Sequence, residues 1–187
     1  MNYNKSNADN AISFFARMLV ITIGCLITSI MIFSISSNVW IRALIQLCQL
    51  ALVIGITYSF FYKIGESDIV LISTGHKAKN IFRGFIISSA SCIPTYLFGI
   101  LLICERFGAV SMNIYNYYKL VNSPFFPFLY TVMPTDMKIM ELSNLDFVMA
   151  LSVLFIIPLI AMFSYMIGLS RFSFRELIFY KKIKTEE

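Results

Sequence analysis

The stretch from Phe147 to Ser170, FVMALSVLFIIPLIAMFSYMIGLS, contains no Asp, Glu, Lys or Arg. The hydrocarbon core of a bilayer is about 30 Å thick, and a helix needs roughly 20 apolar residues to cross it. Three further charge-free stretches reach that length, at residues 18–41, 43–62 and 84–104. Inside lipid, only a helix satisfies every backbone N–H and C=O of such a segment. The sequence therefore predicts an all-α integral membrane protein, a four-helix bundle that forms a single membrane domain over residues 1–187.

The positive charges lie between these stretches and predict an orientation. The segment before the first stretch, the second connection and the tail hold two, four and five Lys or Arg residues, whereas the first and third connections hold one and three. Because Lys and Arg collect on the cytoplasmic side, we expect both termini to be cytoplasmic. The net charge of +5 then reflects this orientation and attraction to anionic lipid headgroups at the cytoplasmic face. No groove-reading pattern of basic residues suggests a nucleic-acid partner.

Polar side chains inside the predicted spans are candidates for contacts between helices. Gln46 and Gln49 lie one turn apart in the second span, where an amide that faces lipid would be costly. Thr28 and Ser29 on the first span and Thr95 on the third are at a similar depth. Two interpretations are open: hydrogen bonds between helices that fix their rotation, or a site for a polar substrate.

Small residues at intervals of four predict where two helices pack closely. In lipid, such stripes allow backbones to approach one another. The stripes of the second and third spans comprise Ala51, Gly55, Ser59, Gly84, Ser88 and Cys92. The two spans run antiparallel, so we expect these stripes to meet. Pro94 and Pro158 near the middles of the third and fourth spans predict bends, and two bends at similar depth would open a cavity.

The connections carry the remaining features. The predicted cytoplasmic loop, 63–83, mixes both signs of charge and reads as a compact interaction loop; its candidate residues are Glu66, Asp68, His76, Lys77 and Lys79. These residues lack a recognised metal-ligand spacing, so we expect neither a metal nor a cofactor. On the outer side, 107–135 is predicted as an interfacial or re-entrant helical segment, in which Lys119 belongs to a polar face turned toward water. The tail, 171–187, is predicted as a basic amphipathic segment on the inner leaflet.

Several local strings carry a resemblance to a known family. They are Gly65-Glu66-x-Asp68 followed by Gly75, Lys79 and Gly84 before a span with a central Pro94, Tyr118-Lys119-x-x-Asn122, Phe126-Pro127, and Gly168 through Tyr180-Lys181-Lys182. In these strings the chain resembles a family of small, uncharacterised bacterial polytopic membrane proteins. It departs from that family at residues 69–72, which are apolar here. The resemblance implies no particular activity, and it carries no catalytic or binding residue over to this chain. We expect the protein to lie in a bacterial plasma membrane.

Taken together, the sequence favours a non-enzymatic role. The four spans hold no side chain that ionises near neutral pH, and HExxH, Walker A and paired intramembrane carboxylates are absent from the sequence. We therefore expect an accessory or interaction subunit with a protein partner in the membrane. The alternative is a small solute-binding or transport component of a multisubunit transporter, with Gln46, Gln49 and the proline-bent helices lining a pocket.

Overall fold

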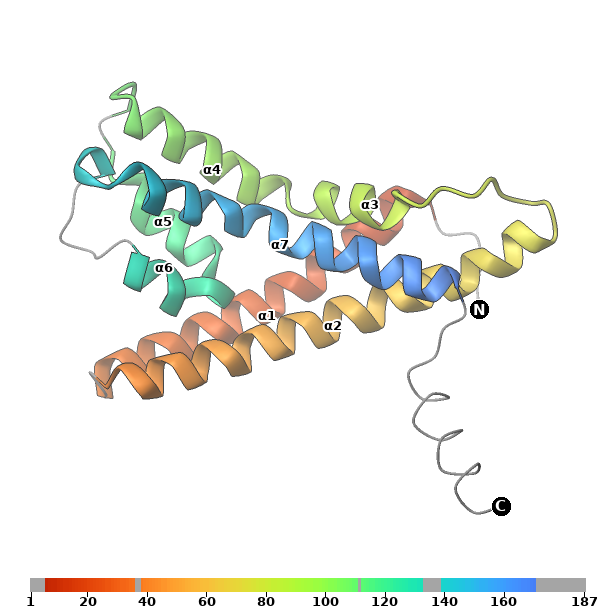
Figure 1. Ribbon diagram of the computed structural model, residues 1–187, viewed down its shortest axis with the longest axis horizontal. Coiled ribbons are helices and arrows are strands. Elements are labelled where there is room, and N and C mark those ends of the chain that lie inside the picture. Colours follow the sequence, from red (N-terminus) through yellow and green to blue (C-terminus); the bar gives the residue numbers. More distant parts are fainter. Residues whose placement is uncertain (1–5, 36–37, 111, 133–138, 171–187) are drawn as a thin grey trace, which may run out of the picture.

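The chain is all-helical in the part that the computed structural model describes, which comprises residues 6–35, 38–110, 112–132 and 139–170 (Figure 1). In chain order the elements are α1 (Asn7–Ile35), α2 (Val39–Ser73), α3 (Arg83–Ser91), α4 (Ile93–Arg106), α5 (Ile114–Val121), the 3-10 turn η1 (Ser123–Phe125), α6 (Phe126–Val132), the 3-10 turn η2 (Ile139–Glu141) and α7 (Asn144–Leu169). The prediction of an all-helical protein is thus confirmed.

Three helices, α1, α2 and α7, are each long and apolar enough to cross a membrane. The pair α3 and α4 passes the same test together, with a bend of 67° between them, so the candidate spans number three, or four if this pair is one span. Large apolar side chains cover the outside of the described helices; Val20, Leu44 and Phe163 are examples. An exterior of this kind suits lipid and is costly in water.

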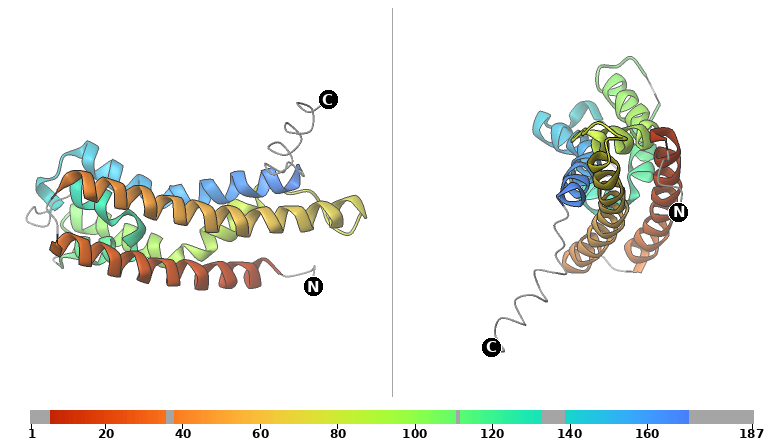
Figure 2. Two further views of the ribbon diagram at one scale, coloured as in Figure 1. Left: turned by 90° about the horizontal axis from the view of Figure 1, so that it is seen from below. Right: turned by 90° about the vertical axis from the view of Figure 1, so that its right-hand side faces the viewer.

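The long helices lie side by side (Figures 1 and 2). One end of the bundle holds the beginning of α1 and the ends of α2 and α7, and is called the N-terminal end below. The opposite end, called the hairpin end, holds the connection between α1 and α2. The short elements α5, η1 and α6 lie between the long helices in the half near the hairpin end (Figure 1). One hydrophobic cluster, around Phe14 and Phe61, fills the half near the N-terminal end, and a second, around Tyr118 and Leu129, fills the other half.

Helices α2 and α7 form the most extensive pair, and glycines set their separation. A Cβ atom at Gly65 would meet the carbonyl oxygen of Tyr165 and, at 2.9 Å, the amide nitrogen of Leu169. A Cβ atom at Gly168 would meet the carbonyl oxygen of Tyr62 and, at 3.1 Å, the Cα of Gly65. The two backbones therefore touch without intervening side chains, which is the contact that small residues permit between helices in lipid.

The third predicted span is broken rather than gently bent. Helix α3 ends at Ser91 and α4 begins at Ile93; the N–H of Cys92 between them donates to the carbonyls of Ser88 and Ser89. Pro94 occupies the first turn of α4, where a missing N–H costs no helical hydrogen bond. The other proline, Pro158, is fully buried inside α7, which continues through it. The bend expected at Pro94 is thus a break one to two residues before that proline.

The predicted cytoplasmic loop, 63–83, is helical over its first eleven residues, because α2 continues to Ser73. At 1.5 Å per residue, α2 is about 50 Å long and exceeds the roughly 30 Å needed to cross lipid. Its continuation is stabilised by the close contact of Gly65 with α7 and by burial of Asp68. The chain then reverses through Gly75, whose φ of 75° is in the left-handed region that favours glycine. The predicted tail, 171–187, lies outside the described residues.

The glycine contact predicts a large difference between two identical substitutions in α2. Gly65→Ala places a methyl group against the backbone of α7 and should lower the free energy of unfolding by about 1 to 3 kcal/mol or more, as overpacking does. Gly55→Ala is the matched control, because nothing lies within 4 Å of that position; it should be neutral or slightly stabilising. The measurement is the thermal unfolding midpoint of the purified variants in one detergent. Equal midpoints for the two variants would contradict the proposed role of this contact.

Candidate functional site

A cavity of about 320 Å³ lies where α1, the break between α3 and α4, and the α5–η1 turn meet. Its walls include Phe15, Met18 and Thr22 of α1, Cys92 and Pro94 at the break, and Asn122 and Pro124 at the turn, with Ile157 of α7 behind them. The break between α3 and α4 and the turn between α5 and η1 are two helix interruptions, and both border this cavity. Where a helix is interrupted, backbone and side chains leave the regular packing, which is how membrane helices form binding sites.

The cavity opens sideways, toward the surroundings of the bundle. Three of its lining residues, Phe15, Leu19 and Leu120, are 38%, 44% and 40% exposed, so they form the rim between α1 and the neighbouring elements. This rim belongs to the apolar exterior of the bundle. Among the described residues that line the cavity, none is charged, and the polar ones are Thr22, Ser91, Thr95 and Asn122. The site is therefore suited to a neutral, apolar molecule.

Gln49 lies with two of its expected neighbours. Its Nε2 donates to the hydroxyls of Ser29 and Thr28, at 2.9 and 3.2 Å, and to the carbonyl of Cys25 at 3.1 Å. The structure does not bring Thr95 to this group; Thr95 lines the cavity instead. Gln49 thus connects α2 to α1, and within the described chain this polar group is separate from the cavity.

Gln46 has a different role from Gln49: its side-chain amide binds the backbone of η1 and of the first turn of α6. Its Nε2 donates to the carbonyl of Pro124 at 3.1 Å, and its Oε1 accepts from the N–H of Phe128 at 3.0 Å. These two backbone groups are the acceptor and donor that a continuous helix would pair directly. The Gln46 amide therefore stands in for one helical hydrogen bond and fixes the segment against α2.

The segment 107–135, so far as it is described, folds back into the bundle. The hydroxyl of Ser123 donates to the carbonyl of Thr22, which lies near the middle of α1. Thr22 is thirteen residues from the end of α1, so this contact is about 20 Å inside the hairpin end. Within the described residues, this segment therefore packs between the long helices and not only against one end of the bundle.

The orientation expected for Lys119 is wrong. Lys119 is 3% exposed, whereas Tyr117 of the same helix is 53% exposed. The Nζ of Lys119 lies 3.9 Å from the centroid of the Tyr115 ring and 5.7 Å from that of Tyr130, so aromatic faces surround the cation. At Lys119, protein covers the side of the helix where the sequence predicts water.

The two small-residue stripes do not meet. Ala51, Gly55 and Ser59 are exposed on α2. The stripe of α3 is buried, but its neighbours are α7 and α1: a Cβ atom at Gly84 would meet the carbonyl oxygen of Ala161 at 2.7 Å. Ser88 and Cys92 continue this buried face. Small residues at a four-residue spacing identify a face for close packing without identifying its partner, and α7 occupies the position expected for α2.

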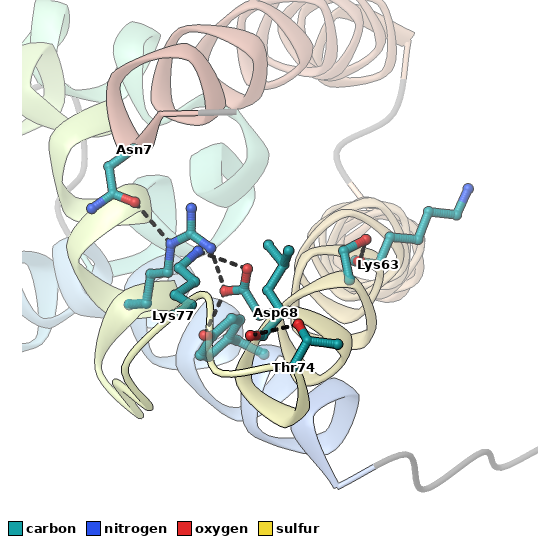
Figure 3. Close-up of polar contacts among 9 residues, drawn as sticks. Asn7, Lys63, Asp68, Thr74 and Lys77 are labelled. Atoms are coloured by element: carbon teal, nitrogen blue, oxygen red, sulfur yellow. Dashed lines mark hydrogen bonds and ion pairs between the residues drawn. The ribbon is translucent and has the colours of Figure 1, made fainter. Parts of the chain in front are cut away.

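A buried ionic cluster, centred on Asp68, joins four helices at the N-terminal end (Figure 3). The carboxylate of Asp68 accepts from Lys77 Nζ at 2.7 Å, from the guanidinium of Arg83 and from the hydroxyl of Tyr165 at 2.7 Å. Arg83 also donates from Nε to the side chain of Asn7 at 2.8 Å. Asp68 and Arg83 are almost fully buried, so each supplies the counter-charge that the other requires.

The other candidates of the predicted interaction loop are on the surface. Glu66, His76 and Lys79 are exposed, and the side chain of Lys63 points away from the Asp68 cluster (Figure 3). Among the residues that the structure describes, no group of three or more His, Cys, Asp or Glu could hold a metal ion. Asp68 therefore belongs to the interior and Lys77 is half-buried beside it, whereas the remaining three candidates are on the surface of the loop.

Sequence reasoning missed Arg83 and Tyr165 as members of the Asp68 cluster. One signal was present: Asp68 directly precedes the apolar run Ile69 to Ile72, which suggests burial, and a buried carboxylate requires a cation nearby. Arg83 directly before the third span was a candidate for that cation. Tyr165 offered no local signal, because aromatic residues are common in apolar spans.

Comparisons of the chain with protein-family models, with curated proteins and with solved structures found no match.

Replacing Asp68 tests the ionic cluster. Asp68→Asn leaves the buried guanidinium of Arg83 without its counter-charge, and breaking a buried pair in this way costs about 3 to 5 kcal/mol. Glu66→Gln removes a charge of the same sign from an exposed position two residues away and should change the stability by less than about 0.5 kcal/mol. Thermal unfolding midpoints in lipid nanodiscs measure both effects. A midpoint for Asp68→Asn equal to that of Glu66→Gln would show that the cluster adds nothing to stability.

Proposed function

We propose that this protein is a four-span, non-enzymatic protein of a bacterial plasma membrane that binds a neutral small molecule from the bilayer. It would serve as the solute-binding component of a larger membrane assembly. The single observation that carries this proposal is the sideways-open cavity at the two helix interruptions. A binding role requires a preformed hollow with a route for the ligand, and this cavity has both.

The position of the cavity supports binding within the membrane. Thr22, near the middle of α1, and Pro94, in the first turn of α4, both line it, so the site is distant from either end of α1. Its rim of exposed apolar side chains lets a molecule dissolved in lipid enter without crossing water. Pro94 belongs to the site as the solute-binding alternative expects, whereas Gln46 and Gln49 do not line the cavity.

The proposed topology places both termini and the N-terminal end of the bundle in the cytoplasm. The Lys and Arg distribution supports this orientation, and α2 would then project from the inner face as far as Ser73. Exposed Lys79, which follows the reversal at Gly75, would lie where the chain returns toward the anionic lipid headgroups. The α5–α6 segment would enter the membrane from the outer side.

A second candidate function is that of an accessory subunit that docks on a protein partner in the membrane. The observation that favours it is the exposure of the Ala51, Gly55 and Ser59 stripe. The equivalent small residues of α3 are covered by a neighbouring helix, and a Cβ atom at Gly55 would have nothing within 4 Å. A partner helix could approach α2 closely along this stripe.

Thiol labelling tests the proposed topology. In a variant without the native cysteines, His76→Cys should resist a membrane-impermeant maleimide in intact cells and react after permeabilisation. Phe107→Cys, at an 82% exposed position in the α4–α5 connection, should react in intact cells. The expectation rests on the two residues lying on opposite sides of the membrane. The reverse pattern, or labelling of both positions in intact cells, would contradict the topology.

Filling the cavity tests the binding role. Durene, a benzene ring with four methyl groups, should raise the thermal unfolding midpoint in nanodiscs by roughly 3 °C at about ten times its Kd. Thr95→Phe places a ring in the cavity and should abolish this shift. Leu97→Phe, at a position of α4 that is 56% exposed, is the matched control and should retain it.

Two outcomes would count against the binding role. If durene stabilises Thr95→Phe as much as the unchanged protein, the ligand binds elsewhere. If neither durene nor any other small apolar probe shifts the midpoint of the unchanged protein, the binding role fails, and the accessory role is the remaining candidate.

A further inference from the structure

We propose that the cavity takes a neutral, lipid-soluble molecule that carries carbonyl oxygens, and that Thr22 and Thr95 donate hydrogen bonds to it. This inference rests on the binding role proposed above and specifies the chemical class of the ligand. It depends on which polar atoms of the cavity wall already have partners.

Two of the four polar lining residues are satisfied within the protein. The hydroxyl of Ser91 donates to the carbonyls of Ala11 and Ile87, each at 2.9 Å. The side-chain nitrogen of Asn122 donates to the carbonyl of Tyr118 at 3.0 Å. Ser91 thereby joins the end of α3 to α1, and Asn122 caps the last turn of α5.

Thr22 and Thr95 are different. Within the described part of the chain, the hydroxyl of neither residue makes a hydrogen bond, although helical threonines commonly donate to the preceding turn, as Thr28 does to the carbonyl of Gly24 at 3.0 Å. Both residues line the cavity. A hydroxyl in apolar surroundings gains by meeting an acceptor, because an unmade hydrogen bond is costly there. Thr22 is on α1 and Thr95 on α4, so the two donors come from different walls.

The ligand is further limited by charge and size. The described lining residues carry no charge, so an ionised ligand would lose its hydration without gaining a counter-ion. A carbon group occupies about the volume of a water molecule, roughly 30 Å³, so 320 Å³ holds about ten such groups. A compact body of that size with oxygen acceptors on opposite sides could meet donors from two walls. A fully methylated benzoquinone ring has these properties.

Duroquinone and durene provide the test, because the two rings carry the same four methyl groups and differ by two carbonyl oxygens. Their Kd values are obtained from the dependence of the thermal unfolding midpoint on ligand concentration in nanodiscs. We expect duroquinone to bind about tenfold more tightly than durene, as two added hydrogen bonds allow. In the double variant Thr22→Val, Thr95→Val, which preserves side-chain shape, this preference should disappear. Thr28→Val on α1, outside the cavity, should preserve it.

Each remaining outcome has a distinct meaning. Equal Kd values for the two rings in the unchanged protein would overturn the inference and leave the binding role intact. A preference for duroquinone that persists in the double valine variant would also overturn it, because other groups would then recognise the carbonyls. Absence of binding by both rings would overturn the inference, and it would overturn the binding role as well if no other small apolar probe shifts the midpoint.

Discussion

The contact between the backbones of α2 and α7 is the constraint on which the rest of the structure depends. Gly65 and Gly168 face one another across the two helices, and a methyl group on either would meet main-chain atoms of the other helix. Hydrophobic burial cannot drive helices together in lipid, so association depends on close packing of this kind. Once α2 and α7 are in contact, Tyr165 reaches Asp68, and Gly84 of α3 fits against the same face of α7.

The interruptions of the helices are the second organising feature. Backbone groups freed by a break must find partners inside the protein, because lipid offers none. At the α5–α6 turn, Gln46 supplies both an acceptor and a donor, and Ser123 is fixed to the carbonyl of Thr22. At the other break, Cys92 still donates to α3 while Pro94 needs no donor partner. These hydrogen bonds stabilise the two breaks, which lie on either side of the cavity. Because both breaks are held in place, the cavity between them stays open.

Much of the fold could be predicted because the positions of the helices depend on apolar runs that are visible in the local sequence. A run of apolar residues long enough to cross lipid must be helical, and four such runs marked α1, α2, the α3–α4 pair and α7. The neighbours of Gln49 could also be foreseen from depth along antiparallel spans, and the structure brings it to Thr28 and Ser29. These inferences required no knowledge of which helix faces which.

The remaining features depend on neighbours that the sequence does not specify. The stripe of Ala51, Gly55 and Ser59 marked a packing face, but α7 took the place beside α3. Lys119 was assigned to water because polarity normally indicates exposure, yet protein surrounds it. The cavity was foreseen only as a consequence of two bends at Pro94 and Pro158. In the structure Pro158 lies within a continuous α7, and the second interruption is instead at the α5–α6 turn.

The ionic cluster around Asp68 has a consequence for how the chain is assembled. Asp68 and Arg83 leave the ribosome well before Tyr165, and Gly65 well before Gly168, because chains are synthesised from the N-terminus. Until α7 is inserted, Asp68 lacks one of its donors and the glycine face of α2 has no partner helix. The contacts of Asp68 and Gly65 are therefore complete only once α7 has been made, and a truncated product without α7 would leave Asp68 without the Tyr165 hydroxyl and Gly65 without the backbone that it touches.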